Sequence, residues 1–325
     1  MNLPDPEPGS GPVLVTGAGG FIGGWVVSRL LAGGFRVRAL VGPLGTPIPA
    51  LPRVDAAVAA GIDDPDALAD LMAGVRAVIH MAGPPSVAAS FDSPEIFARD
   101  HVAGTAAVLK AMRLTGVKRL VHVSSAEVYG VPAVNPVSED HPMQPRSPYG
   151  AAKLGAEAFV RACAPAYGIE AAILRPFSVY GPGLPPRSLV GTVLDQVLAG
   201  SMVRVADSRP IRDYCFVGDV ADAIVSACRL GGMGGVAIIN VASGKGVSVA
   251  DLARLALEIS GRESSAIEAG TPDRPAGTDI LELVANTECA RRVLGWSSRT
   301  SLRDGLTRTM DWLRNREDSA LPSAF

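Results

Sequence analysis

The chain has 325 residues, of which 48% are hydrophobic and 19% charged, a composition typical of a globular protein with one large or two ordinary domains. The formal net charge is -2 and no Lys/Arg stripe with interleaved aromatics is present, so nucleic acid is not expected as a partner. No apolar run approaches the roughly 20 residues of a membrane span, and the N-terminus lacks a signal pattern, so we expect no membrane partner and a cytoplasmic location.

The cysteines carry no metal or disulfide signature. Cys163, Cys215, Cys228 and Cys289 stand far apart, without the paired spacing of a zinc site or a disulfide framework. We therefore expect no metal site and interpret all four as buried thiols.

The first predicted unit is a strand, a glycine-rich turn and a helix. Residues 1–11 contain three prolines and should form a flexible tail, and Pro12 to Thr16 is a short apolar strand. The strand leads into Gly17-Ala18-Gly19-Gly20-Phe21-Ile22-Gly23, and a helix follows to about Ala32. Glycines allow a tight turn and let the backbone approach a pyrophosphate, whose charge would meet N–H groups at the helix N-terminus. This order of elements predicts a dinucleotide-binding site.

The end of the second strand leaves the phosphate state of the dinucleotide open. Arg36 to Val41 is the predicted strand, and an NAD site usually has an acid near its end, about twenty residues past the glycines. This chain has Val41 and Gly42 there, with neither an acid for the ribose hydroxyls nor an adjacent Arg for a 2'-phosphate. Both NAD and NADP therefore remain candidates.

Strands and helices then alternate. The predicted elements are a strand from Val54 to Ala60, a helix from Asp64-Pro65 to Gly74, a strand from Ala77 to His80, a long helix capped by Ser93-Pro94 and running to Thr115, a strand from Arg119 to Ser124, a helix from Pro148 to Tyr167, a strand from Ala171 to Arg175, a helix from Gly218 to Arg229 and a strand from Val236 to Val241. Such alternation predicts a parallel sheet covered on both faces, with functional groups at the carboxyl ends of its strands. Ser125 and Glu127 fall at such an end.

A Tyr-x-x-x-Lys sequence starts one of these helices. Ser147 and Pro148 are suited to the N-cap and first helical position, so Tyr149 and Lys153 should share one helix face. A phenol has a pKa near 10, and a neighbouring ammonium favours the phenolate and lowers that pKa toward the working range. The pair is a candidate acid/base device for a carbinol or carbonyl oxygen.

The C-terminal part alternates less. It contains two helices with capping boxes, Ser248 with Asp251 and Ser301 with Asp304, and a shorter helix that closes at Gly295. The predicted fold class is therefore α/β, a Rossmann-type doubly wound parallel sheet with a smaller, mainly helical C-terminal substrate domain. We assign residues 12–178 and about 214–242 to the dinucleotide-binding domain, 179–213 and 243–316 to the substrate domain, and 317–325 to a tail.

Taken together, these motifs resemble the extended short-chain dehydrogenase/reductase family, in its NAD-dependent nucleotide-sugar epimerase/dehydratase branch. The resemblance covers about residues 12–315. Beyond the glycine turn, Ser125 and the Tyr149/Lys153 pair, it includes His80-Met81-Ala82-Gly83, Gly104-Thr105, Val128-Tyr129-Gly130, Val179-Tyr180-Gly181-Pro182-Gly183, Arg212-Asp213-Tyr214 and Leu294-Gly295-Trp296.

The resemblance implies roles for individual residues. Tyr149 would be the catalytic base and acid, Lys153 would bind the nicotinamide ribose and lower the tyrosine pKa, and Ser125 would hydrogen-bond the reacting sugar oxygen. The expected cofactor is NAD, with NADP not excluded, and its expected contacts are Gly17, Gly20, Phe21, Ile22, Gly23, Val41, Ile62, Met81, Ala82, Gly83, Val123, Tyr149, Lys153 and Pro176. The expected substrate contacts are Ser86, Ser125, Ser178, Arg187, Arg212 and Arg274. Arg212 would pair with the substrate diphosphate, the alternative being a surface salt bridge, and Arg274 is a second candidate phosphate ligand.

The chain departs from the family pattern at several positions. Besides Val41-Gly42, Gly61-Ile62 falls where the family often has an Asp beside the adenine. His101 stands in place of the usual Asn before Val-x-Gly-Thr, and Ser178 replaces a common Asn. His80 and His122, at strand ends, are interpreted as packing or loop-anchoring groups.

Glu127 separates the reactions that the resemblance allows. Family members that move a proton at C5, such as dehydratases and uronate decarboxylases, have a glutamate at this position. The dehydratases commonly pair it with an Asp where this chain has Ala126. Glu127 is thus a candidate second base or a merely structural polar residue.

The favoured prediction is an enzyme that epimerises a nucleoside-diphosphate sugar through a transient 4-keto sugar. The alternatives are a dehydratase or decarboxylase that uses Glu127, a 4-keto sugar reductase, and a non-catalytic dinucleotide-binding protein. The resemblance also implies a homodimer, with helices near residues 94–113 and 149–166 in the contact.

Overall fold

The computed structural model describes residues 11–42, 54–185, 187–232, 234–262, 267–269, 275 and 277–315. The elements in chain order are β1 (Val13–Thr16), α1 (Phe21–Ala32), β2 (Val37–Leu40), β3 (Ala56–Val58), α2 (Pro65–Met72), β4 (Ala77–His80), α3 (Val87–Asp92), α4 (Pro94–Phe97), a π-helix (Ala98–Ala103), α5 (Gly104–Thr115), β5 (Arg119–Val123), a 3₁₀ turn (Ala126–Val128), α6 (Pro148–Tyr167), β6 (Glu170–Pro176), β7 (Ser178–Tyr180), α7 (Leu189–Leu198), β8 (Arg204–Val205), β9 (Ile211–Phe216), α8 (Val217–Arg229), β10 (Val236–Val241), β11 (Gly246–Ser248), α9 (Val249–Ile259), β12 (Glu268–Ala269), β13 (Glu282–Leu283), α10 (Glu288–Leu294) and α11 (Leu302–Arg314).

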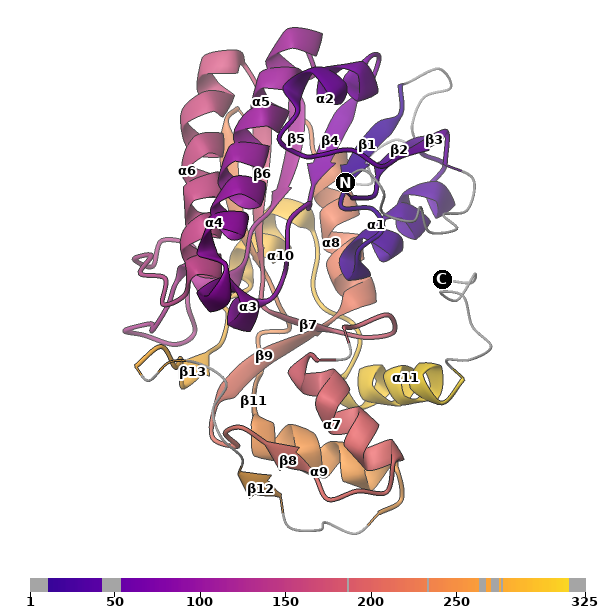
Figure 1. Ribbon diagram of the computed structural model, residues 1–325, viewed down its shortest axis with the longest axis vertical. Helices are drawn as coiled ribbons and strands as arrows, with labels where there is room; N and C mark the ends of the chain where they lie inside the picture. Colours follow the sequence, from indigo (N-terminus) through magenta and orange to yellow (C-terminus); the bar gives the residue numbers. More distant parts are fainter. Residues whose placement is uncertain are drawn as a thin grey trace.

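A seven-stranded sheet forms the centre of the larger part of the molecule (Figure 1). Its strand order is β10-β6-β5-β4-β1-β2-β3, and all of its neighbouring strands are parallel. The order reverses next to β1, because β1 lies between β4 and β2. The Rossmann-type parallel sheet predicted from the alternation is confirmed, and ligands of such sheets bind at this switch point, outside the carboxyl ends of the strands.

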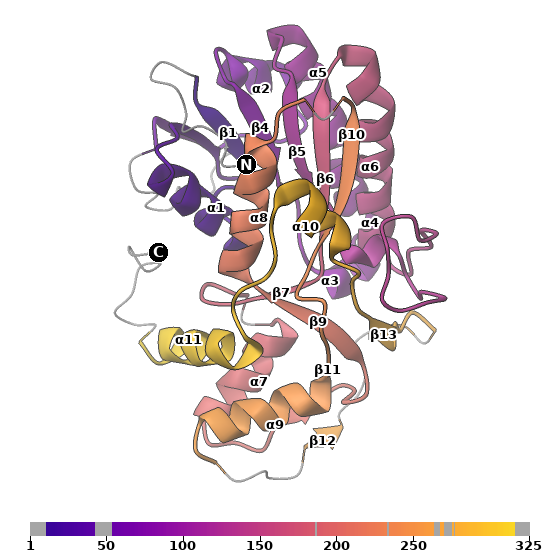
Figure 2. The same cartoon turned by 180° about the vertical axis from the view of Figure 1, so that it is seen from behind.

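Helices cover both faces of this sheet. Helices α2, α5 and α6 lie on the face that Figure 1 presents, and α1 and α8 pack together on the opposite face, where Figure 2 shows α8 and α10 in front of the strands. Strands β1, β4 and the inner part of β6 are buried along their length because both faces are covered. The sheet is therefore a rigid support for groups at its carboxyl edge.

The long helix predicted from Ser93 to Thr115 is present but is not regular. Its middle, Ala98–Ala103, is a π-helix, and the Ser93 side chain does not cap the helix. A further short helix, α3, precedes it and was not predicted. π-Helical segments occur frequently at functional sites, and this one carries His101.

A second sheet lies between the large sheet and helices α7, α9 and α11 (Figures 1 and 2). In this sheet, β9 pairs with β7, β11 and β13, whereas β8 and β12 form a separate two-stranded sheet. The sequence indicated mainly helices in this part, because all of these strands except the six-residue β9 have only two or three residues and leave no periodic signal. Helix α10, inside the segment assigned to the substrate domain, packs on α8 and β10, and the domain boundaries themselves stay a prediction.

Asp213 of β9 fastens the second sheet to two loops. Its buried carboxylate accepts hydrogen bonds from the Ser243 N–H and hydroxyl at 2.8 and 2.6 Å, from the Gly244 N–H at 2.9 Å and from the Ala285 N–H at 3.2 Å. Burial raises the pKa of this carboxyl, and the hydrogen bonds lower it. A carboxylate satisfied in this way is a structural anchor, so the strand that carries the neighbouring Arg212 is held in place.

The prediction of four buried thiols holds for two of the cysteines. All four cysteines are free, but Cys163 and Cys289 are half-buried, and only Cys215 and Cys228 are the buried thiols expected. Within the described residues, no helix combines the length and apolar character needed to cross a bilayer.

Candidate active site

The carboxyl ends of the central strands open into a cavity of about 820 Å³. This volume lies within the range of cofactor sites in proteins. The residues predicted to contact a dinucleotide all line it: Gly17, Gly20, Phe21, Ile22, Gly23, Val41, Ile62, Met81, Ala82, Gly83, Val123, Tyr149, Lys153 and Pro176. The candidate catalytic residues Ser125 and Glu127 line the same cavity.

The glycine turn forms a backbone cradle at one end of this cavity. Gly17 has a φ of +70°, and a Cβ there would lie 3.0 Å from the Ala82 nitrogen. Gly20 is the N-cap of α1, and no side chain in the described residues caps that helix. Its first N–H groups are therefore open to an anion, which fits the pyrophosphate of a dinucleotide.

Helix α6 brings the tyrosine and the lysine to the opposite end. The Ser147 hydroxyl accepts a hydrogen bond from the Gly150 N–H at 3.1 Å, and Pro148 is the first helical residue, as predicted. The Lys153 ammonium donates to the Val123 carbonyl oxygen at 2.9 Å and lies 5.9 Å from the centre of the Tyr149 ring. The two side chains thus share the cavity face of one helix.

The electrostatics of Tyr149 differ from the prediction. Burial of the phenol raises its pKa to about 12, a hydrogen bond with Ser125 lowers the pKa, and the charge of Glu127 raises it. Lys153 instead binds a backbone carbonyl, and its own pKa is lowered by burial to about 8, with the charge of Glu157 raising it. The protein groups alone therefore hold Tyr149 as a protonated phenol, and a cation bound beside it would favour the phenolate.

Glu127 stands next to Ser125 at the reacting end. Its backbone N–H donates to the Ser125 hydroxyl oxygen at 3.2 Å, which fixes the start of the 3₁₀ turn after β5. The Glu127 side chain is half-buried and lines the cavity. A carboxylate is therefore within the same cavity as the Ser-Tyr-Lys set.

His101 also lines the cavity, although it was not predicted as a site residue. Its ring meets the Tyr149 ring edge-on with centroids 5.6 Å apart, and Nε2 donates to the Pro84 carbonyl oxygen at 3.0 Å. A Cβ on Gly83 would lie 2.2 Å from this ring, so the glycine leaves room for it. The substitution of the usual Asn was the signal that could have identified His101.

Three charged residues of the cavity were also missed. Asp63, Arg99 and Asp100 line it near Ile62, and Arg99 pairs with Asp100 at 2.7 Å on the exposed rim. They carry no motif, and their approach to the cavity depends on the π-helix and on the loop after β3. Only the three-dimensional structure could reveal them.

His80 anchors the loop between β4 and α3, as predicted. The Thr105 hydroxyl donates to the His101 carbonyl oxygen at 2.6 Å, so its oxygen accepts from His80 Nε2 at 3.0 Å. His80 Nδ1 then accepts from the Thr16 hydroxyl at 2.8 Å, and the Thr16 oxygen accepts the N–H groups of residues 81 and 82. This chain of bonds holds β1, β4 and α5 together behind the cavity.

Of the predicted substrate contacts in the described part of the chain, only Ser125 lines the cavity. Ser86 caps α3 through the Ala89 N–H, Ser178 starts β7 and Arg187 is exposed before α7. Arg212 lies on β9 and donates to the Ile211 carbonyl oxygen at 3.0 Å. Arg274 lies outside the described residues. The structure therefore brings together the predicted cofactor and catalytic groups, whereas Ser86, Ser178, Arg187 and Arg212 do not line this cavity.

Comparison with known proteins agrees with this geometry. The family model described as "NAD dependent epimerase/dehydratase family" matches residues 13–242. A UDP-glucose 4-epimerase of Mycolicibacterium smegmatis is 35% identical over 321 residues, covering 93% of this chain and 98% of that protein.

Two solved structures are similar along nearly the whole chain. UDP-glucose 4-epimerase from Thermotoga maritima with UDP-glucose is 29% identical with a TM-score of 0.87, covering 94% of this chain and 100% of that one. A dTDP-glucose 4,6-dehydratase from Streptomyces venezuelae with NAD bound is 29% identical with a TM-score of 0.83, covering 94% and 97%.

Proposed function

The chain belongs to the NAD-dependent epimerase/dehydratase family, and from this premise we propose that it is a nucleotide-sugar 4-epimerase. Its cofactor is NAD, which supplies an acceptor and donor of hydride at the sugar carbon. The observation that carries the proposal is the common cavity of the glycine turn and of Ser125, Tyr149 and Lys153. UDP-glucose and UDP-galactose are the first substrates to test, because the similar proteins of Mycolicibacterium smegmatis and Thermotoga maritima are UDP-glucose 4-epimerases.

Groups of the protein would bind the cofactor and transfer the proton. The backbone around Gly17 and Gly20 would hold the pyrophosphate, and the Lys153 ammonium would hold the ribose next to Tyr149. With the phenolate favoured by a cation bound beside it, the Tyr149 oxygen would take the proton of the C4 hydroxyl as the hydride leaves C4. It would return the proton when the hydride comes back to the opposite face of the ketone, with Ser125 bonded to the same sugar oxygen. Arg212 and Arg274 stay predictions as diphosphate ligands.

Interconversion of UDP-galactose and UDP-glucose, followed by ¹H NMR, tests the proposal. A 4-epimerase brings either sugar to the same equilibrium mixture and consumes no added NADH or NADPH. A 4-keto sugar reductase would leave both UDP-sugars unchanged and would consume NADH or NADPH only when a 4-keto sugar is supplied. The family and its enzymatic relatives leave no place for a non-catalytic dinucleotide-binding protein.

A second candidate reaction is favoured by the position of Glu127 in the cavity. A ketone at C4 acidifies the C5–H bond, and a carboxylate could remove that proton, as a dehydratase requires. In a uronate decarboxylase, loss of CO₂ leaves the electron pair on C5, and the same side chain would have to deliver a proton there. Ala126 leaves no carboxylic acid beside it for protonating a leaving hydroxyl. Epimerisation therefore stands first.

We further propose that the protein is a cytoplasmic homodimer. Ile96 of α4, Leu114 of α5 and Phe159 of α6 are exposed to 38%, 62% and 42%, although they are apolar, and the three helices are neighbours. Light scattering should give a dimer mass for the wild type and a monomer mass for Phe159→Glu. Leu281→Glu, at an exposed apolar residue outside these helices, is the control, and a wild-type monomer would contradict the proposal.

A further inference from the structure

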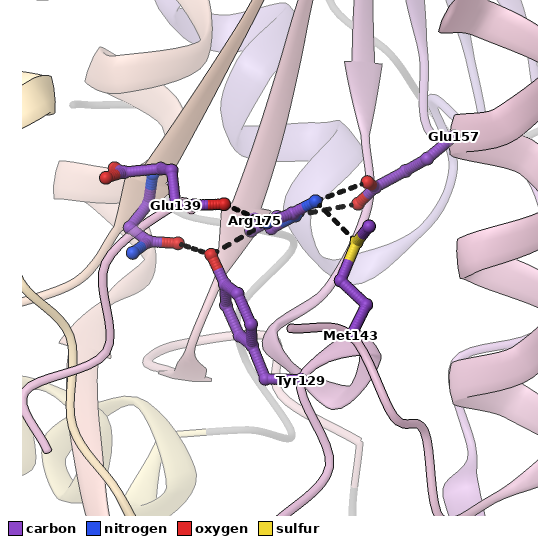
Figure 3. Close-up of polar contacts among 6 residues, drawn as sticks. Tyr129, Glu139, Met143, Glu157 and Arg175 are labelled. Carbon is purple, nitrogen blue, oxygen red and sulfur yellow. Dashed lines mark hydrogen bonds and ion pairs between the residues drawn. The ribbon is translucent and has the colours of Figure 1, made fainter. Parts of the chain in front are cut away.

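Beneath the active-site helix lies a buried ion pair between Glu157 of α6 and Arg175 of β6 (Figure 3). Both side chains have no exposed surface. The guanidinium binds the carboxylate through two bonds, Nε to Oε1 at 2.9 Å and Nη2 to Oε2 at 2.6 Å. Figure 3 shows the two side chains pointing toward each other from their separate elements.

The remaining polar groups around this pair are also satisfied. Arg175 Nη1 donates to the Tyr129 hydroxyl oxygen at 2.9 Å and to the Glu139 carbonyl oxygen at 3.2 Å, and Nη2 contacts the Met143 sulfur at 3.0 Å. The Tyr129 hydroxyl in turn donates to Asn240 Oδ1 at 2.6 Å. The network therefore joins α6 to β6, β10 and the loop before α6.

Stability alone does not account for a buried ion pair of this kind. Removing two charges from water costs several kcal/mol for each ion, and well-packed apolar side chains of similar size are often at least as stabilising. The presence of the pair is therefore better explained by a role in the active site than by stability.

Glu157 lies one helical turn beyond Lys153, as Lys153 lies one turn beyond Tyr149. Side chains four residues apart on a helix are neighbours, so the three groups form one row. Lys153 is only 5% exposed, and its ammonium needs compensation at this depth.

The other titratable groups around Lys153 do not compensate its charge. His80 from β4, His122 from β5 and His101 from the π-helix are buried, and burial together with the charge of Lys153 lowers the pKa of each. They are neutral at pH 7 and repel a cation if protonated. In the described part of the chain, Glu157 is the carboxylate whose charge raises the pKa of Lys153 against the effect of burial.

We propose that Glu157 and Arg175 are positioning residues for the reaction, with Glu157 keeping the Lys153 ammonium charged beside Tyr149 and Arg175 holding the Glu157 carboxylate in place. The inference rests on the role proposed above for Lys153. Above the pKa of Lys153, near 8, the ammonium loses its proton and with it the cation of the site. Loss of the Glu157 charge moves this transition to lower pH.

Direct titration of Lys153 tests the inference without relying on activity. The chain has four lysines, so ¹³C NMR of protein labelled at lysine Cε resolves Lys153 beside the exposed Lys110, Lys118 and Lys245. We expect the Lys153 midpoint to fall by about one pH unit in Glu157→Gln. Glu157→Asp, which keeps the charge, should stay near the wild type.

A double variant separates electrostatics from structure. Glu157→Gln leaves the charge of Arg175 unpaired and buried, which can prevent folding. Glu157→Met with Arg175→Leu replaces the whole pair by apolar groups and should fold, yet its Lys153 midpoint should also fall by about one unit. A wild-type midpoint in the double variant would overturn the inference, even if Glu157→Gln alone shifted, because that shift would come from the uncompensated arginine.

Glu139→Gln is the matched control, since Glu139 belongs to the same network through the Asn240 N–H at 2.8 Å. It should leave the Lys153 midpoint unchanged, and an equal shift there would assign the effect to network disruption. In the epimerase assay, the alkaline limb of kcat/KM should follow the NMR midpoints. If UDP-sugars are not epimerised, the NMR result still decides the inference.

Discussion

Replacement of Gly23 by alanine tests how closely α1 must approach the glycine turn. A Cβ at this position would lie 2.1 Å from the Gly17 carbonyl oxygen and 2.8 Å from that of Ala18. The first distance is about 1.3 Å short of the 3.4 Å at which ordinary contact begins, and both obstacles are backbone atoms. The turn must therefore shift by more than an ångström, which opens the cradle proposed for the pyrophosphate.

Two effects oppose each other in the stability of Gly23→Ala. Helix propensity alone would stabilise the variant by about 1 kcal/mol, whereas overpacking costs about 1–3 kcal/mol. We expect net destabilisation in urea unfolding and an NAD affinity at least tenfold weaker in calorimetric titration. Gly20→Ala, whose Cβ would meet the Gly17 oxygen at 3.2 Å, should change stability much less. Wild-type stability and NAD affinity in Gly23→Ala would refute the reasoning.

Three further outcomes follow from the site. Tyr149→Phe removes the proton acceptor and should lower kcat by about 100-fold or more with NAD still bound; turnover near the wild-type rate would exclude the assigned role. Glu127→Gln should leave 4-epimerisation nearly intact, whereas loss of turnover together with loss of C5 deuterium exchange would favour the second candidate reaction. The free energy of unfolding should decrease on acidification. Burial lowers the pKa of His80 to about 3 and that of His101 to about 2. Below the unfolded value near 6.5, the unfolded chain therefore binds protons that the folded chain does not, and acid favours unfolding. His122→Leu should flatten that decrease and stabilise the protein at pH 7, since both ring nitrogens of His122 are buried without a hydrogen-bond partner in the described residues; an unchanged pH dependence in urea unfolding would contradict this.

Most of the large sheet could be predicted because its signals are local. Buried parallel strands are short apolar runs, and caps such as Ser147-Pro148 mark helix starts within a few residues. The convergence of the predicted cofactor residues on one cavity was predictable for the same reason, since a parallel sheet brings the ends of β1, β4 and β5 to one edge. Motifs far apart in the sequence therefore converge without further information.

The remaining features depend on contacts that the sequence does not display. Strand β7 joins a sheet only by pairing with β9, which lies more than thirty residues further along the chain, and β13 contributes two residues. The π-helix that turns His101 toward Tyr149 has no period of its own in an otherwise helical segment. The high pKa of Tyr149 follows from burial of its side chain. The Tyr-x-x-x-Lys spacing indicated only that Lys153 lies beside it, not how deeply the phenol is buried.

The reaction with UDP-galactose in deuterium oxide tests the proposed function most directly. Purified protein with NAD should form UDP-glucose, detected by ¹H NMR, with protium retained at C4 because the same hydride leaves and returns. A 4-keto-6-deoxy product, or deuterium at C5, would contradict a simple 4-epimerase and assign the chemistry to Glu127. No reaction of either UDP-sugar would contradict the proposed substrate class.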